Sequence, residues 1–190
     1  MALLDSSIDN LTRRKKDLAN YDYIIRQIRQ TDISADDSFQ RKFTYFYKIR
    51  RKAEWRKAYY ELFEENKYNS DVSFEMILRS IYHQTGQIEA SFASKMFAAL
   101  NPERPIWDSI VLSKLRIKPS RNPDKQKRLQ DTVEIYDLIV GWYERFLQSD
   151  EAKEFIQKFD SAFPDYVGFS EVKKIDFLIW GSGDSDPFAS

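Results

Sequence analysis

The chain contains no cysteine, and this absence removes several kinds of site at once. A disulfide, a thiolate-bound metal and a cysteine nucleophile are all excluded. Histidine occurs once, as His83, so a metal site with several histidines cannot form within one chain. A site made only of carboxylates stays open in principle. The chain also lacks a phosphate-binding loop and the Gly-x-Ser-x-Gly and His-Glu-x-x-His motifs, and we expect no metal and no cofactor.

Glycine and proline are absent from residues 1–85, although they are the residue types that most strongly mark turns and strands. Such a stretch is hard to build from strands and easy to build from helices. The apolar spacing agrees, because Tyr21, Ile24, Ile25 and Ile28 follow the i, i+3, i+4, i+7 pattern of one helix face. The sequence therefore predicts an all-α, multi-helix globular fold.

Periodicity and capping residues together predict ten helices and one domain. We expect a single helical domain over residues 1–180, with two lobes meeting near 85–115 as an alternative, and a flexible tail over 181–190. The helix near 128–148 is apolar on most sides, which is typical of a helix at the centre of a core. The predicted helices lie near 6–18, 20–30, 36–51, 53–66, 73–84, 89–100, 105–116, 128–148, 150–162 and 170–180.

Long hydrophobic runs are also missing. The N-terminal segment has only a three-residue apolar run before Asp5, which does not fit a signal peptide. No apolar stretch approaches the roughly 20 residues that a membrane-spanning helix needs. We expect a cytoplasmic protein that makes no membrane contact. Aromatic residues form 15% of the chain, which is enough for a packed interior and argues against a disordered chain.

Acidic and basic residues are equal in number, 30 of each, but the basic ones are unevenly placed. Residues 41–57 hold eight of them, interleaved with tyrosine and tryptophan, and residues 114–128 hold seven. Cations beside aromatic rings suit a phosphate backbone with exposed bases, so both segments are candidate nucleic-acid surfaces. The alternative is that the charges are solvated helix faces paired with acids, and that the aromatic rings belong to the core.

The stretch from Thr85 to Leu115 combines a glycine, a helix rich in small residues, a proline-bracketed turn and an aspartate. Gly86 fits the end of a helix, because glycine tolerates positive φ. Pro105 fits the first turn of the next helix, where its missing N–H costs nothing. Asp108 lies in or near that turn, where a carboxylate interacts favourably with the helix dipole by about 0.3–1 kcal/mol.

This order resembles the core of the helix-hairpin-helix DNA glycosylases, with the hairpin element near residues 73–116. Gly86 matches the first hairpin glycine, and the PIWDSIV segment matches the apolar-Asp segment of that family. The resemblance covers about 30 of the 190 residues. It implies that the backbone amides at Gly86 hold a DNA phosphate and that Asp108 assists cleavage of the N-glycosidic bond of a flipped-out base.

Two positions depart from the family pattern. Ile88 stands where the second hairpin glycine is expected, and Ala90 stands where bifunctional members carry their lysine nucleophile. If the relation holds, the chain therefore lacks lyase chemistry. A longer string, SFASKMFAALNPERPIWDS, is closer still to one found in bacterial proteins of unassigned function, and it implies no activity.

The sequence thus leads to one hypothesis and one alternative, and it leaves open whether the chain is an enzyme. The hypothesis is a nucleic-acid-binding protein of glycosylase-like architecture, either a monofunctional base-excising hydrolase or a catalytically inactive relative; DNA is the candidate partner, and the choice between DNA and RNA stays open. The alternative is a helical protein-interaction domain without an active site. The oligomeric state is not indicated. In the hypothesis Asp108 is the catalytic group, Gly86 contacts phosphate, and the backbone is held by Arg50, Arg51, Arg56, Lys114 and Arg116.

Two further groups have simpler explanations. His83 lies on an otherwise apolar helix and is expected to be a hydrogen-bonded, partly buried side chain rather than a catalytic base. Lys173, Asp176 and Trp180 share one side of the last predicted helix, and a local ion pair accounts for the first two.

Overall fold

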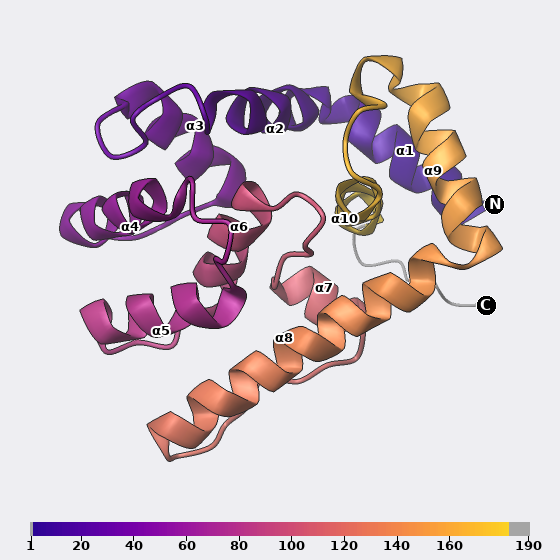
Figure 1. Ribbon diagram of the computed structural model, residues 1–190. Coiled ribbons are helices and arrows are strands. Elements are labelled where there is room, and N and C mark those ends of the chain that lie inside the picture. The colour runs from indigo at the N-terminus through magenta and orange to yellow at the C-terminus, as the bar shows by residue number, and fades with distance from the viewer. Residues whose placement is uncertain (1, 183–190) are drawn as a thin grey trace. The chain divides into compact units, whose positions relative to one another are not determined.

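The computed structural model describes residues 2–182, with side chains from Ser6 onward, and all of its regular structure is helical. Figure 1 shows the ribbon, in which this described part of the chain contains no strand. The prediction of an all-α fold is confirmed. The helices are α1 (Ala2–Arg13), α2 (Lys15–Gln27), α3 (Asp37–Tyr47), α4 (Ala53–Asn66), α5 (Phe74–Thr85), α6 (Ala90–Leu100), α7 (Ser109–Lys114), α8 (Lys125–Leu147), α9 (Asp150–Ala162), the 3-10 turn η1 (Pro164–Tyr166) and α10 (Glu171–Gly181).

The chain divides into two compact units. Residues 16–101 form one of them, here called the inserted unit, which carries nearly all of α2 and the whole of α3 to α6. The segments before and after it form the other, here called the split unit, which carries α1 and α7 to α10.

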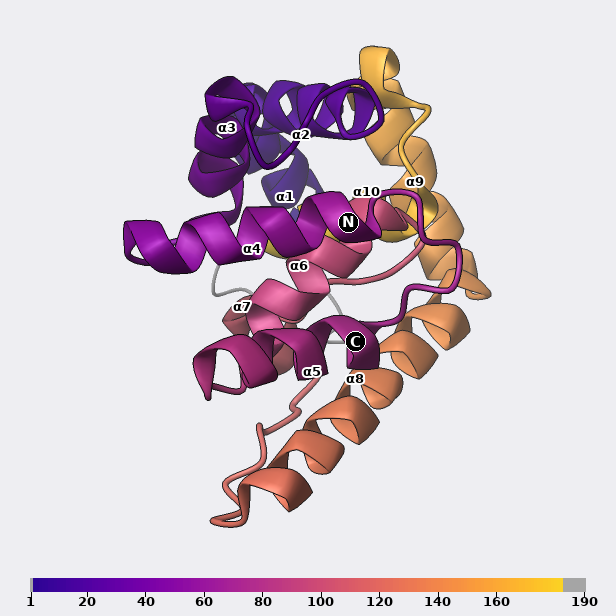
Figure 2. The ribbon, with the colours of Figure 1, turned by 60° about the vertical axis from the view of Figure 1, so that its left-hand side comes forward.

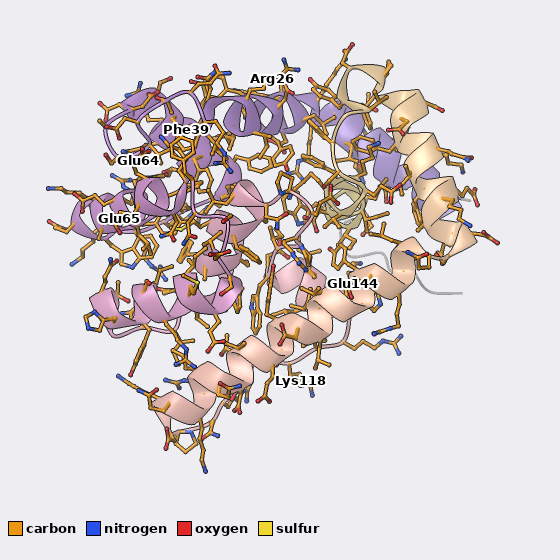
Figure 3. The ribbon with its side chains drawn as sticks, viewed as in Figure 1. Arg26, Phe39, Glu64, Glu65, Lys118 and Glu144 are labelled. Carbon is orange, nitrogen blue, oxygen red and sulfur yellow. The ribbon has the colours of Figure 1, made fainter. Side chains whose placement is uncertain are left out.

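Aromatic rings fill the interior of the inserted unit. Phe43 on α3 lies against Tyr59 and Phe63 of α4, with ring centroids 6.3 and 5.2 Å apart. Phe39 lies against Phe43 and Phe63 as well, with ring centroids 5.8 and 6.1 Å apart. Figure 3 labels Phe39 together with Arg26, whose side chain points outward from α2. Within the basic 41–57 segment, Phe43 and Tyr47 are buried in this core, whereas Tyr45 is 61% exposed.

Helix α6 packs against α5 in the inserted unit (Figure 2). Eight of its eleven residues are buried, among them Ala90, Ala93, Ala98 and Ala99. Small side chains let neighbouring backbones approach, so a helix of this composition can be surrounded on most sides. Ser94 is the polar residue among the buried ones, and its hydroxyl donates a hydrogen bond to the carbonyl oxygen of Ser91 over 3.0 Å.

Helix α10 is the central helix of the split unit, where α1, α7, α8 and α9 all pack against it. Every residue from Val172 to Ile179 is buried, including two lysines and an aspartate. Gly181 allows α1 to come close, because a Cβ at this position would lie 2.7 Å from the carbonyl oxygen of Ser7. The side-chain amide of Asn10 donates to the Gly181 carbonyl over 2.9 Å and joins the same two helices.

Helix α8 is not the fully buried helix that its composition predicts. It buries one stripe, formed by Leu129, Thr132, Tyr136, Ile139 and Tyr143, and it leaves Leu138 61% exposed. The spacing of three and four residues along this stripe is that of a single helix face. The other apolar side chains of α8 are half-buried.

The end of the described chain falls at the start of the predicted tail. Gly181 is the last residue of α10 and Ser182 follows it, both of them buried. Residues 183–190, which make up the rest of the predicted tail, lie outside the described residues. Within the part that is described, no helix combines the length and the apolar character that crossing a bilayer requires.

Candidate functional site

Asp108 occupies the N-cap of α7 in the split unit, with an extended backbone at φ −138° and ψ 173°. Its Oδ1 accepts a hydrogen bond from the backbone N–H of Val111 over 2.8 Å. Its Oδ2 accepts one from the indole Nε1–H of Trp180 over 2.8 Å, across 72 positions of sequence. The side chain is half-buried. Both carboxylate oxygens are therefore held by nitrogen donors while the group stays partly open to solvent.

The prediction that the helix begins at Pro105 is wrong, because α7 starts four residues later, at Ser109. Pro105 and Ile106 are buried in the segment that leads to the cap. The carbonyl oxygen of Pro105 accepts the Tyr136 hydroxyl hydrogen bond over 2.8 Å and is thereby engaged outside any helix. Asp108 then accepts a hydrogen bond from an N–H of the first turn, as an N-cap residue does, and α7 therefore begins directly after Asp108.

The indole of Trp180 is held by its neighbours on α10. The Phe177 ring meets it edge-on, with centroids 5.5 Å apart and planes at 83°. The ammonium nitrogen of Lys173 lies 5.2 Å from the indole centroid, within the range of a cation–π contact. The ring therefore contacts both an ammonium group and the Asp108 carboxylate.

Lys173 also forms the local ion pair that the sequence predicts. Its Nζ lies 2.9 Å from Oδ2 of Asp176, and neither side chain has exposed surface. The Tyr143 hydroxyl donates to Oδ1 of Asp176 over 2.6 Å. Burial raises the pKa of Asp176, although the ammonium group and the hydroxyl oppose the shift, and the charge of Asp108 adds to it. Burial and the nearby carboxylates also raise the pKa of Tyr143 well above its ordinary value.

Two of the predicted phosphate contacts, Lys114 and Arg116, end the same short helix that Asp108 begins. Lys114 is half-buried and Arg116 is exposed. Arg116 has a left-handed backbone with φ 55°. Its N–H bonds the carbonyl of Ser113 over 3.1 Å, and the next N–H bonds the carbonyl of Leu112 over 2.9 Å. This is a Schellman motif in which arginine takes the position that glycine usually holds.

Gly86 ends α5 in the inserted unit, as predicted, with φ 68° and ψ 9°. Its N–H donates to the Tyr82 carbonyl over 2.8 Å, and no atom lies within 4 Å of where a Cβ would stand. Glycine is thus required here by the backbone angle rather than by close packing. The segment that follows leads directly into α6, so α5 and α6 form a helical hairpin around a left-handed glycine.

Glu89 stands at the N-cap of α6 but makes no side-chain capping bond. Its Oε1 instead lies 2.7 Å from the guanidinium Nη2 of Arg51. That guanidinium also lies over the Phe92 ring, 4.8 Å from its centroid. Arg51, predicted to contact phosphate, is therefore engaged by a carboxylate and a ring of its own unit.

The other predicted basic contacts of this unit differ in exposure. Arg50 is exposed and Arg56 is half-buried. No single helix runs through the 41–57 segment, because α3 ends at Tyr47 and α4 begins at Ala53. Trp55 stacks on Tyr59 with centroids 5.1 Å apart, and both belong to the core packing rather than to an exposed stacking face.

The candidate residues fall into two groups. Asp108, Lys114 and Arg116 lie on or beside α7 in the split unit. The inserted unit carries Gly86 and the three arginines Arg50, Arg51 and Arg56. Within it, the Arg51–Glu89 pair ties the 50–52 segment to the hairpin that contains Gly86.

The sequence predicts that Trp180 lies on the same side of its helix as Asp176, but it does not predict the hydrogen bond from Trp180 to Asp108. No local signal could have found that bond, because its two ends are 72 positions apart. His83 is expected to be partly buried, but its side chain is exposed at the end of α5. Among the described residues no cluster of histidine, aspartate and glutamate has the geometry of a metal site.

One open hollow, of about 630 Å³, lies in the split unit between α1 and α9. Asp9, Glu154 and Lys158 are among the residues that line it, and none of the candidate residues does. It offers no support for chemistry at Asp108.

Comparison with known proteins assigns no relatives. No protein-family model matches the chain, no curated protein matches it, and no solved structure matches it.

Proposed function

We propose that this protein binds DNA and that Asp108 acts on the sugar of a flipped-out nucleotide as a monofunctional, base-excising hydrolase. The proposal rests on the position and the hydrogen bonds of the Asp108 side chain. It is a half-buried carboxylate that begins a helix and has both oxygens held in place. Cleavage of an N-glycosidic bond develops positive charge on the sugar, and a fixed carboxylate stabilises that charge.

The α5–α6 hairpin supports the DNA-binding part of the proposal. A left-handed glycine joins the two helices, and α6 begins without a side-chain cap. The first N–H groups of a helix have no intrahelical acceptor and favour an anion. A DNA phosphate at these amides fits the role that the resemblance assigns to Gly86. Ile88, in place of a second glycine, limits how closely a phosphate approaches this turn.

The chemistry proposed for Asp108 needs no other group to change its covalent state. The carboxylate stabilises the cationic sugar as the base departs with the electron pair of the C1′–N bond. Water then adds to C1′, and the proton that it loses passes through solvent to the departed base. The products are a free base and an abasic sugar in an intact strand. Because Ala90 stands where a lysine nucleophile would be needed, strand cleavage by a lyase step is not expected.

DNA binding is tested by fluorescence anisotropy on single-stranded and duplex oligonucleotides over a series of salt concentrations. Contacts to several phosphates require log affinity to fall linearly with log salt, by about 0.9 per phosphate on duplex DNA. Absence of binding at low salt would rule out the proposed function.

Base release is tested on duplexes that each carry one uracil, hypoxanthine, 8-oxoguanine or 7-methylguanine. Wild type is expected to release at least one of these bases, and Asp108→Asn is expected to slow that release by about 100-fold or more. Asp36→Asn is the matched control. Asp36 caps α3 through Oδ1 and accepts the Thr31 hydroxyl at Oδ2, so it repeats the bonding of Asp108 in another helix. Equal rates in wild type and Asp108→Asn remove Asp108 from the chemistry.

The alternative, an interaction domain without an active site, is favoured by one observation. The hydrogen bonds of Asp108 to Val111 and Trp180 give this carboxylate a structural role that needs no substrate. Under this alternative, Asp108→Asn lowers the thermal stability and nothing else. The salt series and the base-release panel separate the two functions.

A further inference from the structure

We propose that Trp180 is the positioning residue for Asp108, holding its carboxylate in the orientation that the cationic sugar requires. This inference rests on the proposed function, since Trp180 acts only through Asp108. Capping α7 requires one carboxylate oxygen, and Oδ1 performs that role. The other oxygen is held by a donor from α10, a helix that Asp108 does not cap.

The two bonds fix the carboxylate from two directions. A helix backbone N–H holds Oδ1 at 2.8 Å, and a rigid indole holds Oδ2 at 2.8 Å. Rotation about the Cβ–Cγ bond of Asp108 breaks both bonds at once. A catalytic carboxylate held in this way needs no reorientation when the positive charge develops, which is where preorganised groups gain their effect.

The indole is itself supported by buried groups. Phe177 meets its edge and the ammonium group of Lys173 lies on the ring at 5.2 Å. Lys173 is fixed by the buried Asp176, which is fixed in turn by the Tyr143 hydroxyl. A cation at the ring withdraws electron density and makes the indole N–H a better donor. Lys173 therefore strengthens the bond to Asp108 without touching the carboxylate.

The test uses two synthetic duplexes of one sequence, each with a single abasic nucleotide analogue. One analogue is a pyrrolidine, which is cationic at neutral pH, and the other is a neutral tetrahydrofuran. A carboxylate that stabilises a cationic sugar binds the pyrrolidine duplex more tightly, so the ratio of the two dissociation constants measures the action of Asp108. This ratio does not depend on which base is the substrate.

Wild type is expected to prefer the pyrrolidine duplex, and Asp108→Asn is expected to lose the preference. Trp180→Phe keeps the ring and removes the N–H, and it is expected to reduce the ratio about tenfold, which corresponds to one charge-assisted hydrogen bond. Trp180→Phe in the Asp108→Asn background is expected to cause no further change. Trp142→Phe is the matched control, because its ring stacks on Phe146 in the same unit, with centroids 4.9 Å apart.

A structural role alone predicts a different pattern. Trp180→Phe would then weaken both duplexes equally, leave the ratio unchanged, and add its effect to that of Asp108→Asn. Either result overturns the inference while the proposed function stands. A wild type without preference for the cationic analogue overturns the proposed function, and the inference with it.

A second measurement reports directly on the hydrogen bond between Trp180 and Asp108. The indole Nε1–H signal of Trp180 in a ¹H–¹⁵N spectrum is assigned as the one lost in Trp180→Phe. Asp108→Asn replaces a charged acceptor by a neutral one and is expected to move that signal upfield. A signal that does not move would show that the indole has no bond to Asp108 in solution, and this also overturns the inference.

Discussion

Lys173 and Asp176 face each other on successive turns of α10, with Nζ 2.9 Å from Oδ2 and no exposed surface on either side chain. Both charged groups are therefore buried away from water in the core that surrounds α10, the central helix of the split unit. Desolvation of the two ions opposes their mutual attraction, so the pair adds little net stability. Removing only one partner is nevertheless costly, because it leaves the other charge buried without a counter-ion.

Lys173→Met is expected to destabilise the protein by about 3–5 kcal/mol, because it leaves the Asp176 carboxylate buried without its ammonium partner. Lys173→Met combined with Asp176→Leu is expected to recover most of that loss. Urea denaturation followed by circular dichroism measures both. A double variant as unstable as the single one contradicts this account of the pair.

The free energy of unfolding is expected to depend on pH through Asp176. Burial raises the pKa of this carboxyl above its ordinary value of 3.8, so between 3.8 and the raised value the folded chain binds more protons there than the unfolded chain. The contribution of Asp176 to stability therefore decreases as pH rises through that window and is constant above it. The difference in stability between wild type and Asp176→Asn, measured by denaturation from pH 3.5 upward, isolates this effect. A difference that grows in favour of wild type over the same window contradicts the direction of the shift.

Gly181→Ala is expected to destabilise the protein by about 1–3 kcal/mol, because the added methyl group collides with backbone that cannot move aside. The nearest atom is the Ser7 carbonyl oxygen, 2.7 Å away. Gly168→Ala is the control, since no atom lies within 4 Å of its Cβ position and its φ is not left-handed. Thermal melting should show a clear loss for the first variant and little change for the second.

Arg116→Gly is expected to raise the free energy of unfolding by about 0.5–1 kcal/mol, because glycine adopts the left-handed backbone without steric cost. If Arg116 contacts a phosphate, the same variant weakens DNA binding and lowers the salt slope by about one. Arg116→Ala separates the two effects, since it removes the charge and keeps the backbone strain. Unchanged affinity in both variants would exclude Arg116 from the DNA surface.

Glu89→Gln is expected to strengthen DNA binding a few-fold, by roughly 1 kcal/mol or less for a partly exposed pair. The change releases Arg51 from its ion pair and removes a negative charge beside the start of α6. Arg51→Gln is expected to weaken binding less than Arg50→Gln, because only Arg50 is exposed without that carboxylate partner. Anisotropy titrations at one salt concentration rank the three variants. Weaker binding by Glu89→Gln argues against a phosphate at this hairpin.

The sequence predicts the helices well wherever local signals determine them. The predictions of 53–66 and 150–162 agree with α4 and α9 to the residue. Ser149 marks the start of α9, and its side chain accepts from the Ala152 N–H as an N-cap does. Local sequence carries this information because a helix and its cap involve only near neighbours along the chain.

The central helix and the site depend on distant partners, and here the sequence is less informative. Composition favours α8 as the central helix, but α10 takes that place because its two buried lysines find carboxylate partners: Lys173 pairs with the buried Asp176, and Lys174 pairs with the half-buried Asp160. The start of α7 depends on the hydroxyl of Tyr136, which lies 31 positions from Pro105. The ion pair of Arg51 could not be predicted for the same reason, since its partner Glu89 is 38 positions away.

The packing of α1 on α10 has a consequence for the order in which the chain folds. The bond from Asn10 to Gly181 spans 171 positions, and the whole inserted unit lies between its ends. During synthesis, residues 16–101 emerge as one uninterrupted segment that contains all of its own helices. The N-terminal helix α1 contacts α9 and α10, and it can form its contacts with the end of α10 only after that helix has left the ribosome. A ribosome-bound intermediate with a folded inserted unit, in which α1 still lacks its contact with α10, is therefore expected from the connectivity.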